Sequence, residues 1–294
     1  MELIPVVDGL YLVPGENGGR FPLAHSILVD GPVRALIDTG CGSSVVDSLI
    51  SERPVDMVIC SHCHPDHTAL NWKFADVPLY MPEYGAESLG DWESLARRFT
   101  GGGRLGGIWR HYVQSAMNFR PSRPTHTFAD GHVFDFGKIS FTVIHTPGHT
   151  IDHTCFFDSR QGILLSFDID LTSFGPWYGH TEGDISAFED SIHKVMALNP
   201  EVVISSHKGV IRDNIADKMQ RFLQVFDDRD RILLDLIPQV RTEADLVAFS
   251  PFYRSNSHSH PLVRYWEEQM VHKHLERLGE RGLIPHPLPS RYTP

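Results

Sequence analysis

The chain has 294 residues, of which 41% are hydrophobic and 21% are charged, and its formal net charge is −11. This length and balance are typical of one large globular domain, or of one domain with a small appendage. The net negative charge argues against a nucleic-acid-binding protein, because such a protein has to neutralise phosphates.

The cysteines and the N-terminus bear on the cellular compartment. Cys41, Cys60, Cys63 and Cys155 form no recognisable disulfide framework, so we expect buried free thiols. The N-terminus has neither the basic region nor the apolar region of a signal peptide. No run of about 18 apolar residues could cross a membrane. We therefore expect a cytoplasmic protein that does not associate with a membrane.

Residues 1–40 alternate short apolar runs with turns, a pattern that favours β-strands. Helices are predicted over 43–52 and over 65–76, the second with Pro65 in its first turn. Strands are predicted at 3–7, 9–13, 25–29, 33–37, 55–60 and 77–81.

Potential metal ligands concentrate in residues 61–67, between the strand at 55–60 and the helix at Pro65. In an extended turn the side chains of His62 and His64 point the same way, so both could bind one ion. Asp66 and His67 follow the bend and could reach a second ion. Imidazole and carboxylate ligands suit a divalent metal such as Zn²⁺, and open α/β sheets bind ligands at the carboxyl ends of strands.

Residues 83–124 are predicted to form a helical insert, with helices over 87–99 and 108–119 and a glycine-rich stretch, 100–107, between them. One interpretation is a lid or substrate wall over the site, with the glycines as a hinge. The other is a surface hairpin or a dimer contact. A phosphate-binding loop is disfavoured, because the stretch lacks the Lys-Ser/Thr pair and a preceding strand.

Residues 126–212 return to strands and supply further candidate ligands. His149 follows a strand and a Pro-Gly turn, and His207 ends the predicted strand 201–205. Asp168 directly follows the apolar run 163–167, where a buried acid is costly unless it is paired or bound to metal. Asp170 is the alternative candidate for the acid that binds metal at this strand end. The remaining strands are predicted at 132–136, 139–145, 154–157 and 163–167, with a helix over 184–198 capped by Asp184.

The loop at 172–183 follows Asp168 and is rich in aromatic side chains. Trp177, Tyr178 and His180 are its candidates for a substrate pocket, and packing against the core is the alternative. His153 is interpreted as an outer partner of the ligands or as a structural residue.

Three helices are predicted after residue 213, over 214–237, 242–247 and 263–279. The last one carries acidic residues beside its basic ones, so we interpret 213–294 as a packing or dimerisation appendage. Asn256, His258 and His260 lie in a loop that could approach the site.

Residues 1–212 resemble the metallo-β-lactamase superfamily of hydrolases. The resemblance rests on the cluster at 61–67 and on four segments in the family's order: Ile37-Asp38-Thr39-Gly40, Thr146-Pro147-Gly148-His149-Thr150, Leu165-Ser166-Phe167-Asp168 and Ser205-Ser206-His207-Lys208-Gly209. It implies a four-layer αββα sandwich, an α/β fold, with a helical, winged-helix-like appendage at 213–294. The chain departs from the family at Phe167, where a glycine is usual, and at Ser206 and Lys208, which flank His207 where the family often has Gly-His-Gly.

The resemblance also implies a ligand set. His62, His64 and His149 would bind one ion, Asp66, His67 and His207 the other, and Asp168 would bridge them. Asp66 would also accept or relay a proton in catalysis, and Asp38 would assist catalysis by orienting ligands through hydrogen bonds.

The implied activity is that of a dinuclear metal-dependent hydrolase, with Zn²⁺ as the expected metal and iron or manganese as alternatives. A hydroxide bridging the two ions would attack an ester-like bond. The plan most resembles glyoxalase II-like hydrolases, so a thioester or another small acyl substrate is the first choice. A lactonase or phosphodiesterase of the same superfamily is one alternative, and a mononuclear iron enzyme similar to persulfide dioxygenases is another. We expect a small-molecule substrate and no nucleic acid, and leave a homodimer open.

Overall fold

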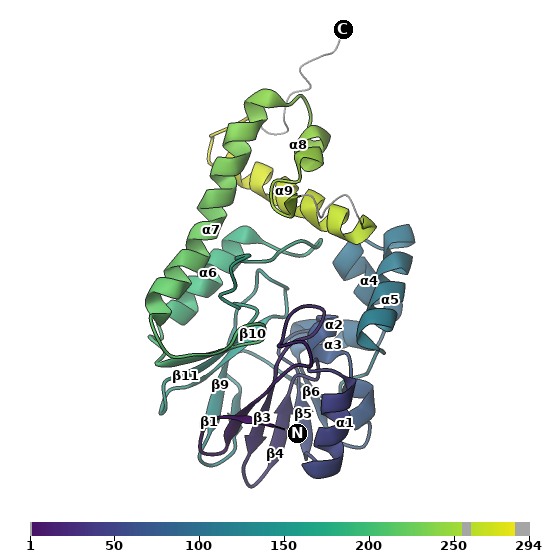
Figure 1. Cartoon of the computed structure of the whole chain (residues 1–294), viewed down its shortest axis with the longest axis vertical. Helices are drawn as coiled ribbons and strands as arrows, with labels where there is room; N and C mark the ends of the chain where they lie inside the picture. Colours follow the sequence, from purple (N-terminus) through teal and green to yellow (C-terminus); the bar gives the residue numbers. More distant parts are fainter. Residues whose placement is uncertain (1, 255–259, 286–294) are drawn as a thin grey trace.

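Two mixed β-sheets pack face to face in the computed structural model, which describes residues 2–254 and 260–285 (Figure 1). The first sheet has the order β1 (Ile4–Val7), β2 (Leu10–Val13), β3 (Ser26–Asp30), β4 (Arg34–Ile37), β5 (Met57–Ile59), β6 (Leu79–Pro82) and β7 (His126–Phe128). The second has the order β13 (Gly209–Ile211), β12 (Val202–Ser205), β11 (Ile163–Phe167), β10 (Thr154–Asp158), β9 (Ser140–His145) and β8 (Val133–Asp135).

Helices cover the outer face of each sheet. The first sheet is covered by α1 (Ser43–Glu52), α2 (Pro65–Thr68), the 3₁₀ helix η1 (Asn71–Phe74), α3 (Glu83–Leu89), α4 (Trp92–Thr100) and α5 (Gly103–Met117). The second is covered by α6 (Ile185–Met196) and α7 (Ile215–Leu236). The chain continues through η2 (Ile237–Gln239) and α8 (Glu243–Phe249) to α9 (Pro261–Glu280). The predicted αββα sandwich with a C-terminal helical region is confirmed.

The apolar runs of the sequence are explained by burial on both sides of each sheet. On β3, Ile27 and Val29 face the core between the sheets, whereas Leu28 faces the helices. On β11, Ile163 and Leu165 face the same inner core and Leu164 faces α6 and α7. Strands covered on both faces need apolar side chains at successive positions, which is why they read as continuous runs.

Three local predictions in the first half are wrong. The helix expected over 87–99 is divided between α3 and α4, with Gly90 and Asp91 between them. The helix expected over 65–76 is α2 followed by the separate helix η1. In the insert, α5 begins at Gly103, so only Gly101 and Gly102 link α4 to α5. Gly106 lies within α5 against α4, and a Cβ atom there would be 3.0 Å from the Cβ of Ala96. This glycine allows close helix packing and is not part of a hinge loop.

The C-terminal helices are joined to the rest of the molecule. α9 contacts α5, α6 and α7, so it spans the space between the insert and α7 (Figure 1). From 213 onward the described residues contain helices and no strand, so no wing of a winged helix is found among them. Asn256 and His258 lie outside the described residues, and His260 caps α9.

All four cysteines are buried free thiols, as predicted. No helix in the described part of the chain is both long enough and apolar enough to cross a membrane.

Candidate metal centre

The seven predicted ligand residues converge where the carboxyl ends of strands from both sheets meet. The ligand atoms of each group below lie within 4.8 Å of one another. The first group is His62, His64, His149 and Asp168, and the second is Asp66, His67, Asp168 and His207. The turn after β5 supplies His62 and His64, and α2 supplies Asp66 and His67. The other three, His149, Asp168 and His207, come from the β9–β10 turn and from the ends of β11 and β12.

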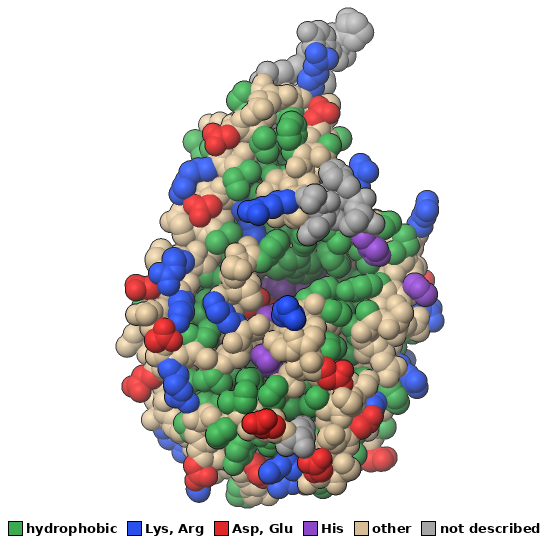
Figure 2. All heavy atoms as spheres, in the orientation of Figure 1, with side chains coloured by type: hydrophobic (Ala, Val, Ile, Leu, Met, Phe, Trp, Pro, Cys, Tyr) green, Lys and Arg blue, Asp and Glu red, His purple; other side chains and the backbone are tan. Residues whose placement is uncertain are grey.

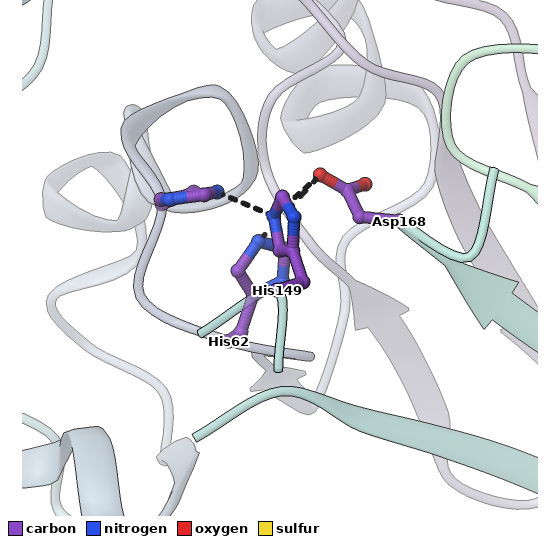
Figure 3. Close-up of side chains that lie close together, drawn as sticks. His62, His149 and Asp168 are labelled. Atoms are coloured by element: carbon purple, nitrogen blue, oxygen red, sulfur yellow. Dashed lines mark hydrogen bonds and ion pairs between the residues drawn. The ribbon is translucent and has the colours of Figure 1, made fainter. Parts of the chain in front are cut away.

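Asp168 belongs to both groups and lies between them. Its Oδ2 is 3.0 Å from Nε2 of His149, and its Oδ1 is 3.0 Å from Nε2 of His67. Figure 3 shows His62, His149 and Asp168 pointing toward one another, with the His149 contact dashed. The pairing of β11 with β12 is irregular between Leu165 and Phe167, and Phe167 has a φ of 47°. This left-handed turn occurs at the position where the family favours glycine.

The donor atoms fit divalent metal ions. Nε2 of His62, Nε2 of His67 and Oδ1 of Asp168 are buried and have no hydrogen-bond partner among the described residues, although the last two are only 3.0 Å apart. Buried polar atoms are normally satisfied, and atoms left without partners at such short separations are expected where lone pairs face a shared cation. Burial lowers the pKa of His62 and of His64 well below the usual value, which keeps both rings in the neutral form that binds metal.

The second group has a different electrostatic balance. Burial alone would lower the pKa of His67 and of His207, but neighbouring carboxylates outweigh it. Asp168 contributes most in both cases; the pKa of His67 is held well above its usual value and that of His207 is raised to about 9. Metal binding at this group therefore has to displace protons.

Hydrogen bonds to a carboxylate or to a backbone carbonyl orient three of the histidine rings. Nδ1 of His67 is 2.7 Å from Oδ2 of Asp38, whose carboxylate also accepts from the backbone N and the Oγ of Ser61 at 2.8 and 2.7 Å. Nδ1 of His149 and Nδ1 of His207 each lie within 2.8 Å of a backbone carbonyl, which can only accept. Each ring therefore presents Nε2 to the metal centre. Asp38 lies outside the cavity lining, so it positions a ligand and does not face substrate.

A cavity of about 340 Å³ opens onto the ligands. In the space-filling view, histidine side chains are visible in a hollow bordered mostly by hydrophobic side chains (Figure 2). Trp177 and His180, two of the three residues predicted for a substrate pocket, line this cavity. Tyr178, the third, lies outside the lining: it is fully buried, and its hydroxyl lies 2.6 Å from Nε2 of His274 and 2.9 Å from Nη1 of Arg229. Consecutive residues of an extended loop point to opposite sides, so Tyr178 faces α7 and α9.

Several lining residues were not predicted individually. They come from the N-terminal loop, the insert and the C-terminal segment, and include Arg20, Phe21, Phe99, Trp109, Tyr112, Val113, Met117, Tyr253 and Trp266. The aromatic content of the insert was the only available signal, and it does not indicate which face of α5 is turned to the site. The insert thus forms one wall of the cavity.

The insert is attached beside the ligands through Arg98 of α4. Its guanidinium donates to Asp152 at 2.6 Å and to both oxygens of Glu182 at 2.6 and 2.7 Å. Cys63, Asp152 and Glu182 have the spacing of a third ligand group. Because Arg98 pairs with both carboxylates, we interpret this group as an ion-pair cluster and not as a metal site.

His153 and Asp170 both lie close to Asp168. Nε2 of His153 accepts from the backbone N of Asp168 at 3.3 Å, consistent with an outer partner of a ligand. Asp170 lines the cavity but belongs to neither ligand group. Burial raises the pKa of Asp170 to about 6.

The family model of the metallo-beta-lactamase superfamily matches residues 23–207. The chain therefore belongs to the metallo-β-lactamase superfamily.

Two curated fungal relatives are similar over most of the chain. The lactamase-like protein nscB of Trichophyton rubrum is 25% identical over 83% of this chain and 67% of its own length. An atrochrysone carboxyl ACP thioesterase of Pseudocercospora fijiensis is 25% identical over the same shares. The chain spans 49% to 67% of the length of the first curated relatives. These names agree with the predicted enzyme class, a hydrolase of ester or thioester bonds, and do not favour the iron dioxygenase alternative.

Solved structures agree on the fold. A metallo-beta-lactamase family protein of Thermus thermophilus aligns with a TM-score of 0.74 and 21% identity over 95% of both chains. A beta-lactamase domain protein of Burkholderia ambifaria aligns with a TM-score of 0.68 and 18% identity over 96% of this chain and 90% of its own. The agreement extends over the C-terminal helices, since nearly the whole chain is covered.

Proposed function

We propose that this protein is a dinuclear metal-dependent thioesterase, with zinc as its metal. The single observation that carries the proposal is Asp168, whose two carboxylate oxygens lie 3.0 Å from Nε2 of His149 and 3.0 Å from Nε2 of His67. A carboxylate shared by two ligand groups is suited to bridging two ions. The thioesterase names among the relatives support the choice of bond.

His62, His64 and His149 would hold one ion, and Asp66, His67 and His207 the other, with Asp168 between them. When bound, two divalent ions lower the pKa of water from about 15.7 towards about 7 and polarise a carbonyl oxygen. A side chain then only has to accept the proton that the water gives up.

Asp66 is the residue of this chain best placed to handle the proton. It lines the cavity, its Oδ2 is 3.5 Å from Nε2 of His207, and burial raises the pKa of its carboxyl group. In hydrolysis the water oxygen bonds to the acyl carbon, the carbon–sulfur bond breaks, and sulfur leaves as a thiolate. Asp66 would take a proton from the water and return it to that thiolate.

The aromatic lining of the cavity favours a thioester substrate with an apolar acyl group. Phe99 packs against the His64 ring with centroids 5.0 Å apart, and Trp177 packs against the same ring at 5.6 Å. Trp109, Met117 and Trp266 add to the apolar lining of the cavity. A substrate carbonyl at the ligands would therefore place its acyl chain against aromatic rings, and burial of apolar surface would contribute to binding.

The test uses the purified full chain with a measured metal content. Release of thiol from acetyl and benzoyl thioesters of N-acetylcysteamine should follow the bound zinc, disappear after chelation and return when zinc is added. We expect the benzoyl compound to have the higher kcat/KM. A zinc-loaded protein that hydrolyses lactones or phosphodiesters but neither thioester would refute the proposal.

A further inference from the structure

One ring nitrogen of His64 and one of His149 contact the pocket loop, which we define as residues 172–183. Nδ1 of His149 donates to the carbonyl of Trp177 at 2.8 Å. Nε2 of His64 lies 2.8 Å from Nε2 of His180. On the ligand side of the rings, Nε2 of His149 and Nδ1 of His64 are themselves 2.8 Å apart. The loop therefore contacts both rings opposite the atoms that would bind metal.

The contact with His64 accounts for the placement of His180. This side chain is buried, and its Nδ1 has no hydrogen-bond partner in the described structure. Its ring hydrogen bond is thus the one to His64. When Nδ1 of His64 binds metal, a neutral His64 ring carries its proton on Nε2, and Nε2 of His180 is the acceptor that fixes this tautomer.

The pocket loop is held in turn by Arg229 of α7. Nη1 donates to the carbonyl of Pro176 at 2.6 Å and to the Tyr178 hydroxyl at 2.9 Å, and Nη2 donates to the carbonyl of Phe174 at 2.7 Å. In the described part of the chain all of these partners are neutral oxygens, although the Arg229 side chain is buried. Burying a guanidinium without a carboxylate is costly, so this arrangement is expected where the loop position matters.

α9 holds the same loop from the other side. His274 connects the Tyr178 hydroxyl, at 2.6 Å from Nε2, to the carboxylate of Asp230, at 2.6 Å from Nδ1. Nζ of Lys273 donates to the carbonyl of His180 at 2.7 Å. Residues 174, 176, 178 and 180 are thus all tied to α7 or α9 through buried or half-buried hydrogen bonds.

We infer that the C-terminal helices act on the metal centre through the pocket loop, with Arg229 and His274 as positioning residues for His64 and His149. Arg229 and His274 fix the loop, and the loop's Trp177 carbonyl and His180 ring fix the two ligand rings. The inference rests on the proposed function only for the ion that these rings would hold. The metal affinity of the first ligand group would then depend on helices that begin more than 45 residues after Asp168, the last ligand of that group.

The test measures metal affinity in the full chain. Co²⁺ loading followed by visible absorption, and Zn²⁺ competition with a chelator, report the two sites without requiring turnover. For His180→Ala we expect about a 10- to 100-fold weaker first-ion site, the range seen when outer partners of metal ligands are removed. His180→Gln retains an acceptor for Nε2 of His64 and should recover most of that affinity. Arg229→Met should weaken the same site and change the Co²⁺ spectrum, while the second ion stays bound.

Leu278→Ala is the matched control for general destabilisation. Leu278 is buried in the apolar cluster of α7, α8 and α9, which also contains Leu233, Leu246 and Leu275. Its removal should lower Tm because it leaves a cavity, yet it takes away no hydrogen bond of the pocket loop. The first-ion affinity of Leu278→Ala should therefore match that of the wild type.

Two results would overturn the inference. One is an unchanged first-ion affinity in His180→Ala. This variant decides the question even if Arg229→Met does not fold. The other is an equal loss of affinity in Arg229→Met and Leu278→Ala at an equal loss of Tm. Because the readout is metal binding, a wild type that binds metal but hydrolyses no thioester would remove the proposed substrate and leave this inference standing.

Discussion

The two ligand groups share Asp168 but differ in their surroundings. The first group contacts neutral partners: the Trp177 carbonyl, the His180 ring and the aromatic side chain of Phe99. The second is surrounded by carboxylates, with Asp38 bonded to His67 and Asp66 3.5 Å from Nε2 of His207.

This difference separates two ways of preparing a metal site. Burial keeps His62 and His64 neutral by lowering the pKa of each, so these ligands are ready for a cation. Carboxylates raise the pKa of His67 and of His207, so the second group is held together by protons until metal replaces them. The first group depends on packing by the pocket loop, and the second depends on charge.

The largest expected effect comes from the residue that both groups share. Asp168→Asn should remove metal from both groups and lower thioesterase kcat/KM by about 10³-fold, because several kcal/mol of metal-dependent stabilisation are lost. Metal stoichiometry and kinetics measure the outcome. Asp170→Asn is the control, since Asp170 lines the cavity outside both groups and should leave the stoichiometry unchanged. The reverse result would assign the bridging role to Asp170.

A smaller effect restricted to the second group is expected for Asp38→Asn. Its carboxylate orients His67, and outer partners of this kind change metal affinity by about 10- to 100-fold. Zinc titration against a chelator should therefore show one weakened site and one unchanged site. An equal loss at both sites would contradict the separation of the two groups.

The charge difference predicts how zinc binding varies with pH. The pKa of His207 is raised to about 9 in the folded protein. Its proton therefore stabilises the metal-free fold fully at pH values below the pKa of histidine in the unfolded chain, and this contribution is lost as the pH rises through 9. Zinc has to displace that proton, so affinity at the second group should rise by about tenfold per pH unit for each proton displaced and then level off near pH 9. Calorimetry in two buffers of different ionisation enthalpy counts the protons released. A second-site affinity that is constant between about pH 7 and pH 9 would contradict this prediction.

The smallest effect concerns the wall beside the first group. Phe99→Leu keeps an apolar side chain but removes the ring that packs on His64. We expect both metals to stay bound and kcat/KM for a benzoyl thioester to fall by about five- to tenfold, with less change for an acetyl thioester, because roughly 1 kcal/mol of apolar contact is lost. Equal losses for both substrates would indicate that Phe99 acts on His64 and not on the acyl group.

The sequence by itself was sufficient for the layer order and for the residues that the fold brings together as candidate ligands. Each ligand directly follows an apolar run or lies in a short turn after one, and strand ends bring such residues to one edge of a sheet regardless of the rest of the chain. The strands are buried on both faces, so their apolar runs stand out. Asp168 is an example: its place after 163–167 favoured it over Asp170, and it is Asp168 that belongs to both candidate ligand groups.

Only the tertiary structure decided what surrounds those ligands. The alternation of an extended loop turns Trp177 to the cavity and Tyr178 to α9, and a one-residue shift would have exchanged them without any change in composition. α5 begins at Gly103 and includes Gly106 and Gly107, although glycine has a low helix propensity, and Gly106 packs closely against α4. The hydrogen bonds of Arg229 and His274 join residues about 50 to 100 positions apart, and such pairings are set by how helices pack across the sandwich, which no local pattern in a single sequence encodes.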